Sequence, residues 1–483
     1  MVKKLSDLLE VTDVLAVSVN RDAEITGLVI DSRKVQPGDL FIAVKGGQSD
    51  GHKYLDQALE SGAVAVLVTD GRTEIGPDMI SLRWEDDLLG KLANVYYDYP
   101  SEQLTVIGIT GTNGKTTVAT LLHQAIVATG SKCGLISTVK IVVGDEEFPS
   151  ELTTPDVLTL HRIHFEMLQA GCSYVIMEVS SHAIHQRRIQ GIEFDCGIFT
   201  NITHDHLDYH NSFSEYIRVK KMFFDSLEPE AVAITNTDDK NGEVMLQNTK
   251  AKKVSYALKH GCEYKGKILS STLEGLHLEF NSIEALFRLA GNFNAYNLLA
   301  AYACMVELDV APHEETLTIL TQVRPPEGRL EVIRVPSKQA LAIVDYAHTP
   351  DALANVLKTI KAMTSGKVVT VVGCGGDRDK AKRPKMAAIA AHFSDQVILT
   401  SDNPRTENPE TILDEMEVGI TDEDDHRVFR MTQRDKAIKM GVMLVEAGDV
   451  LLVAGKGHEK YQEINGVRTP FDDKRKIMEF SIR

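Results

Sequence analysis

The sequence has few cysteines and a shortage of positive charge, and each shortage excludes a class of protein. Six cysteines occur among 483 residues, and no two of them form a CxxC pair. In so long a chain this usage indicates reduced, buried thiols of a cytoplasmic protein. Lys and Arg number 52 against 69 Asp and Glu, a net charge of −17. So acidic a chain is not expected to bind nucleic acid, which requires a basic surface.

Long hydrophobic runs are also absent. No run approaches the roughly 18 apolar residues that a membrane span needs. The N-terminal residues, Met1 to Asp7, lack the apolar core of a signal peptide. We therefore expect a cytoplasmic monomer without membrane insertion. The 43% hydrophobic and 25% charged residues are ordinary globular usage, and the length suggests about three domains.

Strand-like and helix-like runs alternate along the whole chain, which predicts an α/β protein. We expect a smaller α/β domain over residues 1–100. A central domain over residues 101–334 follows, with a doubly wound, mostly parallel sheet covered by helices. A Rossmann-like domain over residues 335–483 completes the chain. The stretch 99–101 contains Pro100 and is the predicted linker between the first two domains.

One motif indicates a phosphate-binding loop between a strand-like run and a helix: Gly111-Thr112-Asn113-Gly114-Lys115-Thr116-Thr117. Glycines let backbone N–H groups face phosphate oxygens, and the helix N-terminus adds positive partial charge. Lys115 would neutralise phosphate charge, and the Thr116 hydroxyl would bind Mg²⁺. The pattern predicts a P-loop nucleotide site, although Ile109 stands where the usual first glycine would fall.

Polar residues follow two further strand-like runs. Glu178 lies at the end of one run, where ligands collect in doubly wound sheets, and is a candidate ligand of a second Mg²⁺. His204, His206 and His210 follow the other run, but no cysteine lies near them in sequence to complete a zinc site. We interpret His204 and His210 as capping or hydrogen-bonding residues.

Several motifs together resemble the Mur ligase family, the ATP-dependent amino-acid ligases of peptidoglycan synthesis. They occur in the family's order and are Gly111–Thr117, Glu178–His182, Thr200-Asn201 with Asp205–Asp208, Gly291-x-Phe293-Asn294-x-x-Asn297, Gly328-Arg329-x-Glu331 and Asp345-Tyr346-Ala347-His348-x-Pro350. Residues 31–43 and Asp402–Arg405 resemble the members that add the third residue of the stem peptide.

The resemblance implies a mechanism. ATP phosphorylates the terminal carboxylate of UDP-N-acetylmuramoyl-L-alanyl-D-glutamate, and the incoming amine then displaces phosphate from the acyl phosphate. Lys115 and Mg²⁺ would screen the approaching anions. The family's second Mg²⁺ would lie between Glu178, His206 and a carbamate that CO₂ forms on Lys220. The neighbouring Lys221 is the alternative carbamate position.

The resemblance also implies binding roles by position. For ATP, residues 111–117 are joined by Asn294 and Asn297 near the adenine and by Arg329 and Asp345 at phosphate and ribose. The residues predicted to contact the UDP end of the substrate are Ser32, Gln48 and Ser49. Those predicted to contact the muramoyl peptide are Thr153, Thr154, Ser180, Gln186 and Arg188. An alternative interpretation is that the two threonines cap a helix that begins at Pro155.

The amino acid remains to be chosen between meso-diaminopimelate and L-lysine. Only diaminopimelate ends in a second carboxylate, which a guanidinium binds best. Asp402-Asn403-Pro404-Arg405 follows a strand-like run, so Arg405 is expected at the active-site edge of the third domain. Family members that add diaminopimelate carry this pattern. The resemblance adds Arg378, Gly455 and Glu459 to the pocket, with Glu459 taking the distal ammonium. We therefore predict the diaminopimelate-adding reaction, with lysine as the alternative.

Two more distant alternatives rank below this prediction. A folylpolyglutamate synthetase shares the phosphate loop and the third domain but lacks a first domain of the Asp31-Ser32-Arg33 type. A non-catalytic nucleotide-binding regulator with a degenerate ligase body would be expected to have lost Lys115, Glu178 or His206. All three residues are present.

Overall fold

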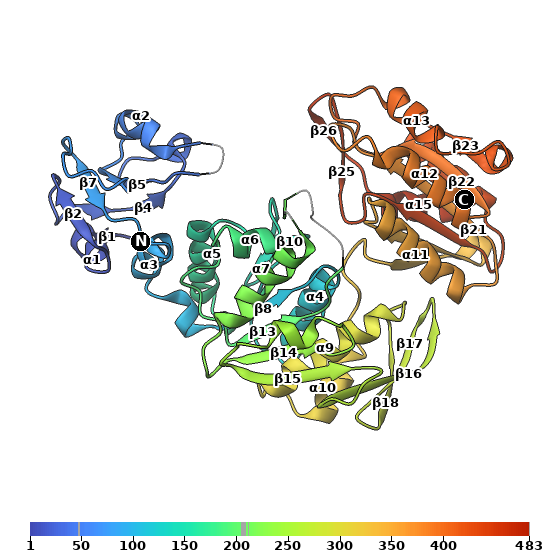
Figure 1. Cartoon of the computed structure of the whole chain (residues 1–483). Coiled ribbons are helices and arrows are strands. Elements are labelled where there is room, and N and C mark those ends of the chain that lie inside the picture. Colours follow the sequence, from blue (N-terminus) through green and yellow to red (C-terminus); the bar gives the residue numbers. More distant parts are fainter. Residues whose placement is uncertain (47–48, 204–208, 211, 483) are drawn as a thin grey trace. The chain divides into compact units, whose positions relative to one another are not determined.

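The computed structural model describes residues 1–46, 49–203, 209–210 and 212–482 (Figure 1). The chain divides into two compact units, one made of residues 1–115 and 126–255 and the other of residues 116–125 and 256–483. The division into domains at residues 100 and 334 stays a prediction.

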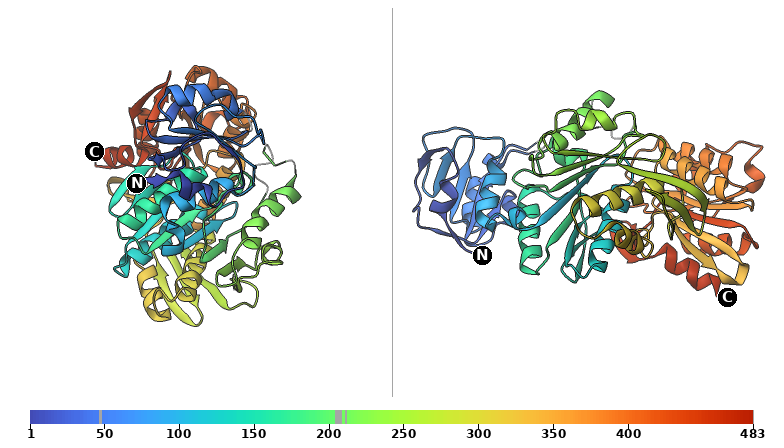
Figure 2. Two further views of the ribbon diagram at one scale, coloured as in Figure 1. Left: turned by 90° about the vertical axis from the view of Figure 1, so that its left-hand side faces the viewer. Right: turned by 90° about the horizontal axis from the view of Figure 1, so that it is seen from below.

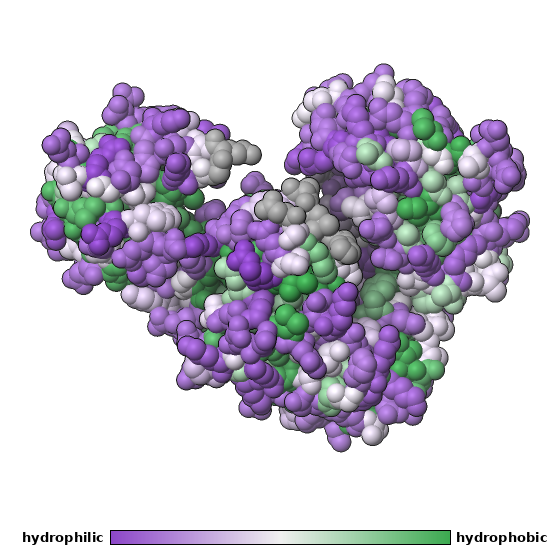
Figure 3. All heavy atoms as spheres, viewed as in Figure 1, coloured by the Kyte–Doolittle hydropathy of each residue, from purple (hydrophilic) through white to green (hydrophobic). Residues whose placement is uncertain are grey.

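In the described part, no helix is both long and apolar enough to cross a bilayer. All six cysteines are described, and none forms a disulfide. The face drawn in Figure 3 is mostly hydrophilic.

The N-terminal part has a five-stranded sheet in the order β2-β7-β6-β5-β4, parallel except for β2 against β7. Side chains alternate between its two faces: Leu40 packs with α1 and α3, and Phe41 packs with α2. The bounds are β1 (Lys3–Lys4), α1 (Leu5–Leu9), β2 (Val14–Val17), β3 (Glu24–Ile25), β4 (Gly27–Val29), β5 (Asp39–Ala43), α2 (Leu55–Glu60), β6 (Ala65–Val68), β7 (Met79–Leu82) and α3 (Leu88–Tyr97).

The predicted linker is more ordered than expected. Tyr99 has a left-handed backbone, and Pro100 begins a short 3₁₀ helix, η3 (Pro100–Gln103). Ser101 is buried, and its Oγ accepts a hydrogen bond from the Glu193 N–H at 3.2 Å. The connection between α3 and β8 is therefore packed against the chain.

The central part has an eleven-stranded sheet in the order β11-β10-β9-β12-β8-β13-β14-β15-β16-β17-β18. The strands from β9 to β14 pair in parallel, and antiparallel hairpins form both ends, so the predicted mostly parallel sheet is confirmed. The strands are β8 (Thr105–Thr110), β9 (Cys133–Ile136), β10 (Lys140–Val143), β11 (Glu146–Pro149), β12 (Tyr174–Glu178), β13 (Cys196–Phe199), β14 (Val232–Asn236), β15 (Lys252–Ala257), β16 (Tyr264–Thr272), β17 (Gly275–Phe280) and β18 (Ile283–Phe287).

Helices connect the parallel strands of this sheet, and strands and helices alternate along it (Figure 2). Val118, Leu121, Leu122, Ala125 and Ile126 have the spacing of one apolar helix face, and all five are fully buried in the helix that forms there. The helices are α4 (Lys115–Ala128), α5 (Val157–Gln169), α6 (Ser181–His185), α7 (Phe213–Asp225), α8 (Gly242–Met245), α9 (Phe293–Glu307) and α10 (His313–Leu320).

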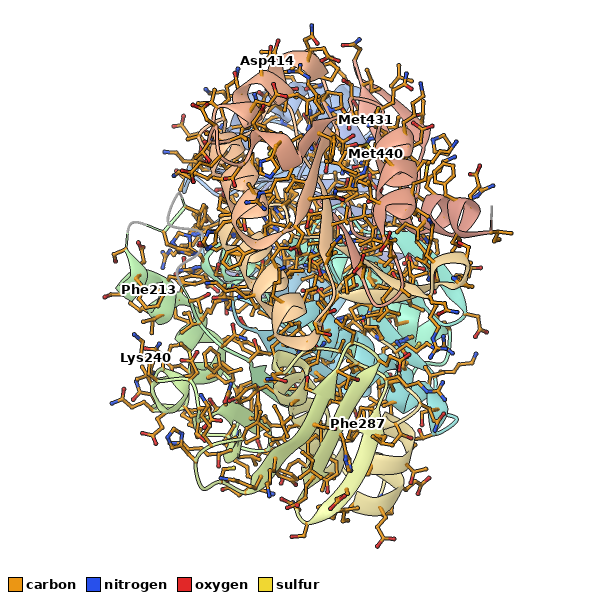
Figure 4. The ribbon with its side chains drawn as sticks, turned by 90° about the vertical axis from the view of Figure 1, so that its right-hand side faces the viewer. Phe213, Lys240, Phe287, Asp414, Met431 and Met440 are labelled. Atoms are coloured by element: carbon orange, nitrogen blue, oxygen red, sulfur yellow. The ribbon has the colours of Figure 1, made fainter. Side chains whose placement is uncertain are left out.

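The C-terminal part has a six-stranded sheet in the order β19-β20-β24-β21-β22-β23, parallel except for β19 against β20. Helices α11 to α13 share one apolar core with it, and α14 and α15 share the core of the other face. Figure 4 labels Asp414 on α13 and Met440 on α14, helices of opposite faces. This two-sided covering is the predicted Rossmann-like arrangement.

The elements of this part are β19 (Glu331–Val335), β20 (Ala340–Asp345), α11 (Pro350–Met363), β21 (Val368–Cys374), α12 (Lys382–Phe393), β22 (Gln396–Ser401), α13 (Pro409–Glu417), β23 (Val428–Arg430), α14 (Arg434–Leu444), β24 (Val450–Ala454), β25 (Tyr461–Ile464), β26 (Val467–Pro470) and α15 (Asp473–Ser481).

Candidate active site

The predicted phosphate loop connects β8 to α4. Gly111 and Gly114 have φ angles of 153° and 90°, which residues with a side chain rarely adopt. A Cβ atom on Gly111 would lie 1.9 Å from Thr200 Oγ1, so no side chain fits there. Gly114 directly precedes Lys115, the first residue of α4. The turn therefore brings the chain to the positive end of a helix, where phosphate binds readily.

Residues that follow β13 hold this loop in shape. The Thr112 N–H donates to Asn201 O at 2.8 Å, and the Asn113 N–H donates to Asn201 Oδ1 at 3.0 Å. The carbonyl of Asn113 accepts from Asn201 Nδ2 at 3.0 Å and from Thr200 Oγ1 at 2.6 Å. Thr200 and Asn201 belong to a family motif, but the sequence predicts no site role for them.

Two lysines converge on one carbonyl oxygen of the loop. Lys115 Nζ donates to Gly111 O at 2.9 Å, and Lys220 Nζ donates to the same oxygen at 3.0 Å. Lys220 is only 1% exposed, on the inner side of α7. Lys221 instead pairs with Asp225, one helical turn further on, at 2.5 Å. The buried lysine at the loop is therefore Lys220. Thr116 and Thr117, at the start of α4, are buried as well.

Glu178 is the last residue of β12, and its register partner in β8 is Ile109. The side chain is fully buried. Its Oε1 accepts from the Thr138 N–H at 2.8 Å, whereas Oε2 has no hydrogen-bond partner among the described residues. A buried carboxylate oxygen without a donor is costly unless a cation binds it. Glu178 Oε2 therefore fits a hard cation such as Mg²⁺.

The predicted histidine ligand cannot be placed, because His204 and His206 lie outside the described residues. His210 is described and buried; its Nε2 lies 3.0 Å from Ser181 Oγ, and its ring packs 5.2 Å from that of Tyr216. The interpretation of His210 as a hydrogen-bonding residue is confirmed. Within the described ranges, no three His, Cys, Asp or Glu side chains come together as a metal cluster.

Four of the residues predicted to contact the muramoyl peptide form one hydrogen-bonded group beside Glu178. Thr154 Oγ1 donates to the Glu178 carbonyl at 2.8 Å and accepts from the Ser180 N–H at 3.1 Å. Arg188 Nη1 donates to Thr154 O at 2.8 Å, and Arg188 Nη2 donates to Gln186 Oε1 at 2.6 Å. The structure thus brings together residues from three separate segments of the chain.

The alternative interpretation of the two threonines as helix caps is wrong. Helix α5 begins at Val157, and its cap is Asp156, whose carboxylate accepts from the Thr159 N–H. A carboxylate is a strong cap, and it leaves the threonine hydroxyls available for other partners. Thr153 Oγ1 lies 3.0 Å from Thr138 Oγ1.

The residues predicted near the adenine are neighbours in α9. Asn294 Nδ2 donates to Ala290 O at 2.7 Å, and Asn297 Nδ2 donates to Asn294 Oδ1 at 2.8 Å. Both side chains are buried, so they are fixed in orientation.

Arg329 and Asp345, predicted at phosphate and ribose, also lie together. The Asp345 carboxylate accepts from the Leu330 and Ala347 N–H groups at 2.7 and 2.8 Å. Burial raises the pKa of Asp345, and these N–H groups and Arg329 partly offset it. The Arg329 guanidinium lies 4.7 Å above the Tyr346 ring, and its buried Nε has no hydrogen-bond partner among the described residues.

The predicted amino-acid pocket lies at the carboxyl ends of three neighbouring parallel strands, β24, β21 and β22, where ligands bind in doubly wound sheets. Asn403 Nδ2 donates to Glu459 Oε2 at 2.7 Å. Arg405 Nη1 donates to the carbonyl of Gly376, in the turn that also carries the exposed Arg378, at 2.7 Å. The remaining pocket residues lie beside these: Asp402 and Asn403 are buried, and a Cβ atom on Gly455 would lie 2.5 Å from Asp402 Oδ2.

Comparison with known proteins identifies the family. The Mur ligase middle domain matches residues 109–305, the glutamate ligase domain of Mur ligases matches residues 328–457, and the catalytic domain of the Mur ligase family matches residues 24–94. A relative from Cytophaga hutchinsonii, named UDP-N-acetylmuramoyl-L-alanyl-D-glutamate--2,6-diaminopimelate ligase, is 48% identical over 480 residues, which are 99% of this chain and 98% of the relative. The chain belongs to the Mur ligase family.

Other relatives agree. A Parabacteroides distasonis protein of the same name is 50% identical over 480 residues, 99% of this chain and 98% of its own. A solved structure, also of a UDP-N-acetylmuramoyl-L-alanyl-D-glutamate--2,6-diaminopimelate ligase, is 32% identical, with a TM-score of 0.72 over 100% of this chain and 99% of that one. The predicted family and the three-domain α/β Mur ligase fold are thus confirmed.

One residue beside the predicted amino-acid pocket was not among the site residues predicted for this Mur ligase. Lys456 is fully buried, and its Nζ donates to Asn403 Oδ1 at 2.7 Å. The same nitrogen lies 3.5 Å from Glu459 Oε2 and 3.6 Å from Asp402 Oδ1. Burial and Asp402 raise the pKa of Glu459, while Lys456 and Asn403 oppose the rise. The sequence signal that could have indicated this residue is Lys456 itself, which stands between Gly455 and Gly457 and three residues before Glu459.

Two of the three residues predicted to bind the UDP end in this Mur ligase, Ser32 and Ser49, lie in the described part of the chain. Ser32 is buried, and its Oγ donates to Gln57 Oε1 at 3.2 Å. Ser49 Oγ donates to Tyr54 OH at 3.4 Å. Both partners belong to one short segment, so the two serines share a neighbourhood. Gln48 lies outside the described residues.

Proposed function

We propose that this Mur ligase uses ATP to join meso-diaminopimelate to UDP-N-acetylmuramoyl-L-alanyl-D-glutamate. The observation that carries the proposal is Arg405, whose guanidinium donates to Gly376 O at the carboxyl ends of parallel strands, in the same loop as Asn403, which donates to Glu459. A guanidinium binds a carboxylate in bidentate fashion, and diaminopimelate has a distal carboxylate that lysine lacks. The names of relatives 48% and 50% identical over nearly the whole chain support the same choice.

The reaction requires activation of a carboxylate, because a carboxylate is a poor electrophile. Transfer of the ATP γ-phosphoryl group to the terminal carboxylate gives an acyl phosphate, and attack by the amine expels phosphate and forms the amide. Both reactants of the first step are anions. Lys115 and the N-terminus of α4 would reduce their repulsion, and Thr154, Ser180, Gln186 and Arg188 would orient the peptide. The preformed loop around Gly111 supports the binding of ATP phosphates.

Mg²⁺ would supply positive charge at the reacting phosphate and would be held by Thr116 and, at a second site, by Glu178, His206 and carboxylated Lys220. The unpartnered Glu178 Oε2 supports the second site. Carboxylation requires the neutral amine of Lys220, which attacks the carbon of CO₂ and releases one proton as the carbamate forms. The carbamate replaces a cation by an oxygen ligand, which suits Mg²⁺.

The test is the formation of UDP-tripeptide and the release of phosphate with purified protein, ATP, Mg²⁺ and the UDP-dipeptide. Diaminopimelate, lysine, ornithine and glutamate are supplied in parallel. We expect product with diaminopimelate and at least about 10²-fold lower kcat/KM with lysine, because lysine leaves Arg405 without an anion. Equal use of lysine would overturn the choice of amino acid, and no dependence on the UDP-dipeptide would overturn the ligase proposal.

We also propose a cytoplasmic location and a monomeric state. The six cysteines without a disulfide and the use of ATP support the location. Light scattering after size-exclusion chromatography tests the oligomeric state.

A further inference from the structure

Two segments of the C-terminal part carry pocket residues and lie directly against each other. The turn after β21, residues 375–378, ends in Arg378, and the loop after β22, residues 402–407, contains Arg405. A Cβ atom on Gly376 would lie 1.9 Å from Pro404 O, and one on Gly375 would lie 2.9 Å from Arg405 Nη1. No side chain separates the turn from the loop, so a shift of one segment moves the other.

The direction of the Arg405 side chain depends on this packing. Arg405 has a φ angle of 50°, a left-handed conformation that residues with a side chain seldom adopt. Its N–H donates to Glu463 O at 3.1 Å, and its carbonyl accepts from the Asn465 N–H at 2.6 Å. These bonds fix the backbone, while the guanidinium is fixed by its bond to Gly376 O at 2.7 Å.

Three residues hold the turn to the loop. Glu407 Oε1 accepts from the Asp377 N–H at 2.6 Å. Thr406 Oγ1 donates to Asp377 Oδ1 at 2.8 Å, and the Thr406 N–H donates to Asp377 Oδ2 at 3.2 Å. We call Asp377, Thr406 and Glu407 the turn–loop clamp.

A buried arginine anchors the clamp. Arg383, in the first turn of α12, is fully buried and donates to the two carboxylate oxygens of Glu407 at 2.9 and 3.0 Å. It also donates to Gly375 O at 3.2 Å, so it contacts both segments. Glu407 holds its charge, since Arg383 and the Asp377 N–H lower its pKa to about 2.

The chain offers a matched control. Glu415 on α13 accepts from the same Arg383 at 2.6 Å. Unlike Glu407, it makes no hydrogen bond to residues 375–378 or 402–407 in the described part of the chain. Replacing either glutamate by glutamine removes one carboxylate from Arg383, but only the Glu407 change also weakens a bond to the turn.

We propose that Asp377, Thr406 and Glu407 are positioning residues that determine amino-acid specificity, because they hold the turn whose carbonyl orients the Arg405 guanidinium. This inference rests on the proposed function, in which Arg405 binds the distal carboxylate of diaminopimelate. The clamp does not touch the substrate; it reduces the motion of the one group that distinguishes diaminopimelate from lysine.

The experiment measures kcat and KM for diaminopimelate, lysine and ATP with Glu407→Gln, Thr406→Val and the control Glu415→Gln. For Glu407→Gln we expect KM for diaminopimelate to rise about tenfold with kcat within about twofold, because the Arg405 contact is made with bound substrate. Thr406→Val should shift KM in the same direction by a smaller factor. KM for ATP and kcat/KM for lysine should stay within about twofold, so the preference for diaminopimelate falls.

Melting temperatures separate specificity from stability. Both variants should be destabilised, and Glu407→Gln more so, because Glu407 accepts two bonds from Arg383 and one from the Asp377 N–H whereas Glu415 accepts one from Arg383. Equal KM values for diaminopimelate in these two variants would overturn the inference. If Glu407→Gln does not fold, Thr406→Val decides the matter, because Thr406 is exposed and does not contact Arg383. Wild-type protein that ligates no diaminopimelate would overturn the proposed function instead.

Discussion

The phosphate loop and the amino-acid pocket are built in different ways. The loop is one continuous stretch, and it is shaped by glycines and by backbone groups bonded to Asn201. The pocket combines side chains from the ends of three strands. There, Lys456 lies among Asp402, Asn403 and Glu459. A second buried cation, Arg434, donates to both carboxylate oxygens of Asp473 at 2.8 and 2.7 Å.

The difference agrees with the ligands that we propose for the two sites. Phosphate is bound by many weak donors of fixed geometry, which a backbone turn supplies. An amino acid with charges at both ends needs charged side chains, and each buried charge must be paired, because an unpaired one is costly in a low dielectric. A site of the first kind is sensitive to changes in shape and local cations, and one of the second kind is sensitive to loss of a partner charge.

The largest expected effect is at the loop. Lys220→Ala should lower kcat by about 10³-fold or more, because it removes the proposed carbamate ligand of Mg²⁺ from the reacting phosphate. Bicarbonate or a short carboxylate such as acetate should restore part of the activity of this variant. Steady-state phosphate release measures both effects.

Lys221→Ala is the matched control for Lys220. Lys221 pairs with Asp225 one turn further along α7, and no described hydrogen bond links it to the phosphate loop. Activity within about threefold of wild type is therefore expected. Rescue of Lys221→Ala by carboxylates, with none for Lys220→Ala, would show that the carbamate is on the neighbouring residue.

A smaller effect is expected in the pocket. Arg405→Ala should weaken kcat/KM for diaminopimelate by about 2–4 kcal/mol of transition-state binding, because the distal carboxylate loses its guanidinium. KM for ATP should not change, since ATP is assigned to other residues. A loss as large as that of Lys220→Ala, with ATP affected as well, would remove the distinction between the two sites.

Lys456→Met should raise KM for diaminopimelate about tenfold. Loss of the ammonium leaves Glu459 and Asp402 close together without their cation, so the pKa of Glu459 rises further. Raising the pH should therefore recover part of the affinity in Lys456→Met. Lys456→Arg keeps the positive charge, so its KM for diaminopimelate should lie between those of wild type and Lys456→Met. A KM of Lys456→Met that does not change with pH would contradict this account.

Replacement of His164, a buried histidine in α5, is expected to have the smallest effect on activity. Neither of its ring nitrogens has a hydrogen-bond partner among the described residues, and burial lowers its pKa to about 3. The folded protein therefore binds fewer protons than the unfolded chain between pH 6.5 and about 3, so stability falls as the pH falls through this window. At pH 5 the loss amounts to about 2 kcal/mol.

His164→Leu should remove this part of the pH dependence. Melting temperatures of wild type and variant between pH 7.5 and 5 test it: the variant should lose less stability on acidification. His426→Ala, at an exposed histidine, is the control and should behave like wild type. The same acid sensitivity in wild type and His164→Leu would contradict the assignment.

Sequence reasoning was most successful where the signal is local. The glycine turn before α4, the buried stripe of that helix and the parallel strands could all be predicted, because each depends on residues close together in the chain. It was weaker where a competing local group decides the outcome. Asp156, not a threonine, caps α5, since a carboxylate next to the helix satisfies its N–H groups best.

The sequence by itself determined the α/β class, the glycine-rich motif of the phosphate loop and the order of the family motifs. Only the tertiary structure separated Lys220 from Lys221, exposed the unpartnered oxygen of Glu178 and revealed Lys456 inside the pocket. The physical reason is that burial and partner choice depend on which strand ends meet at one edge of a sheet. Residues that are distant in the chain become neighbours at that edge, and their spacing along the sequence does not predict this proximity.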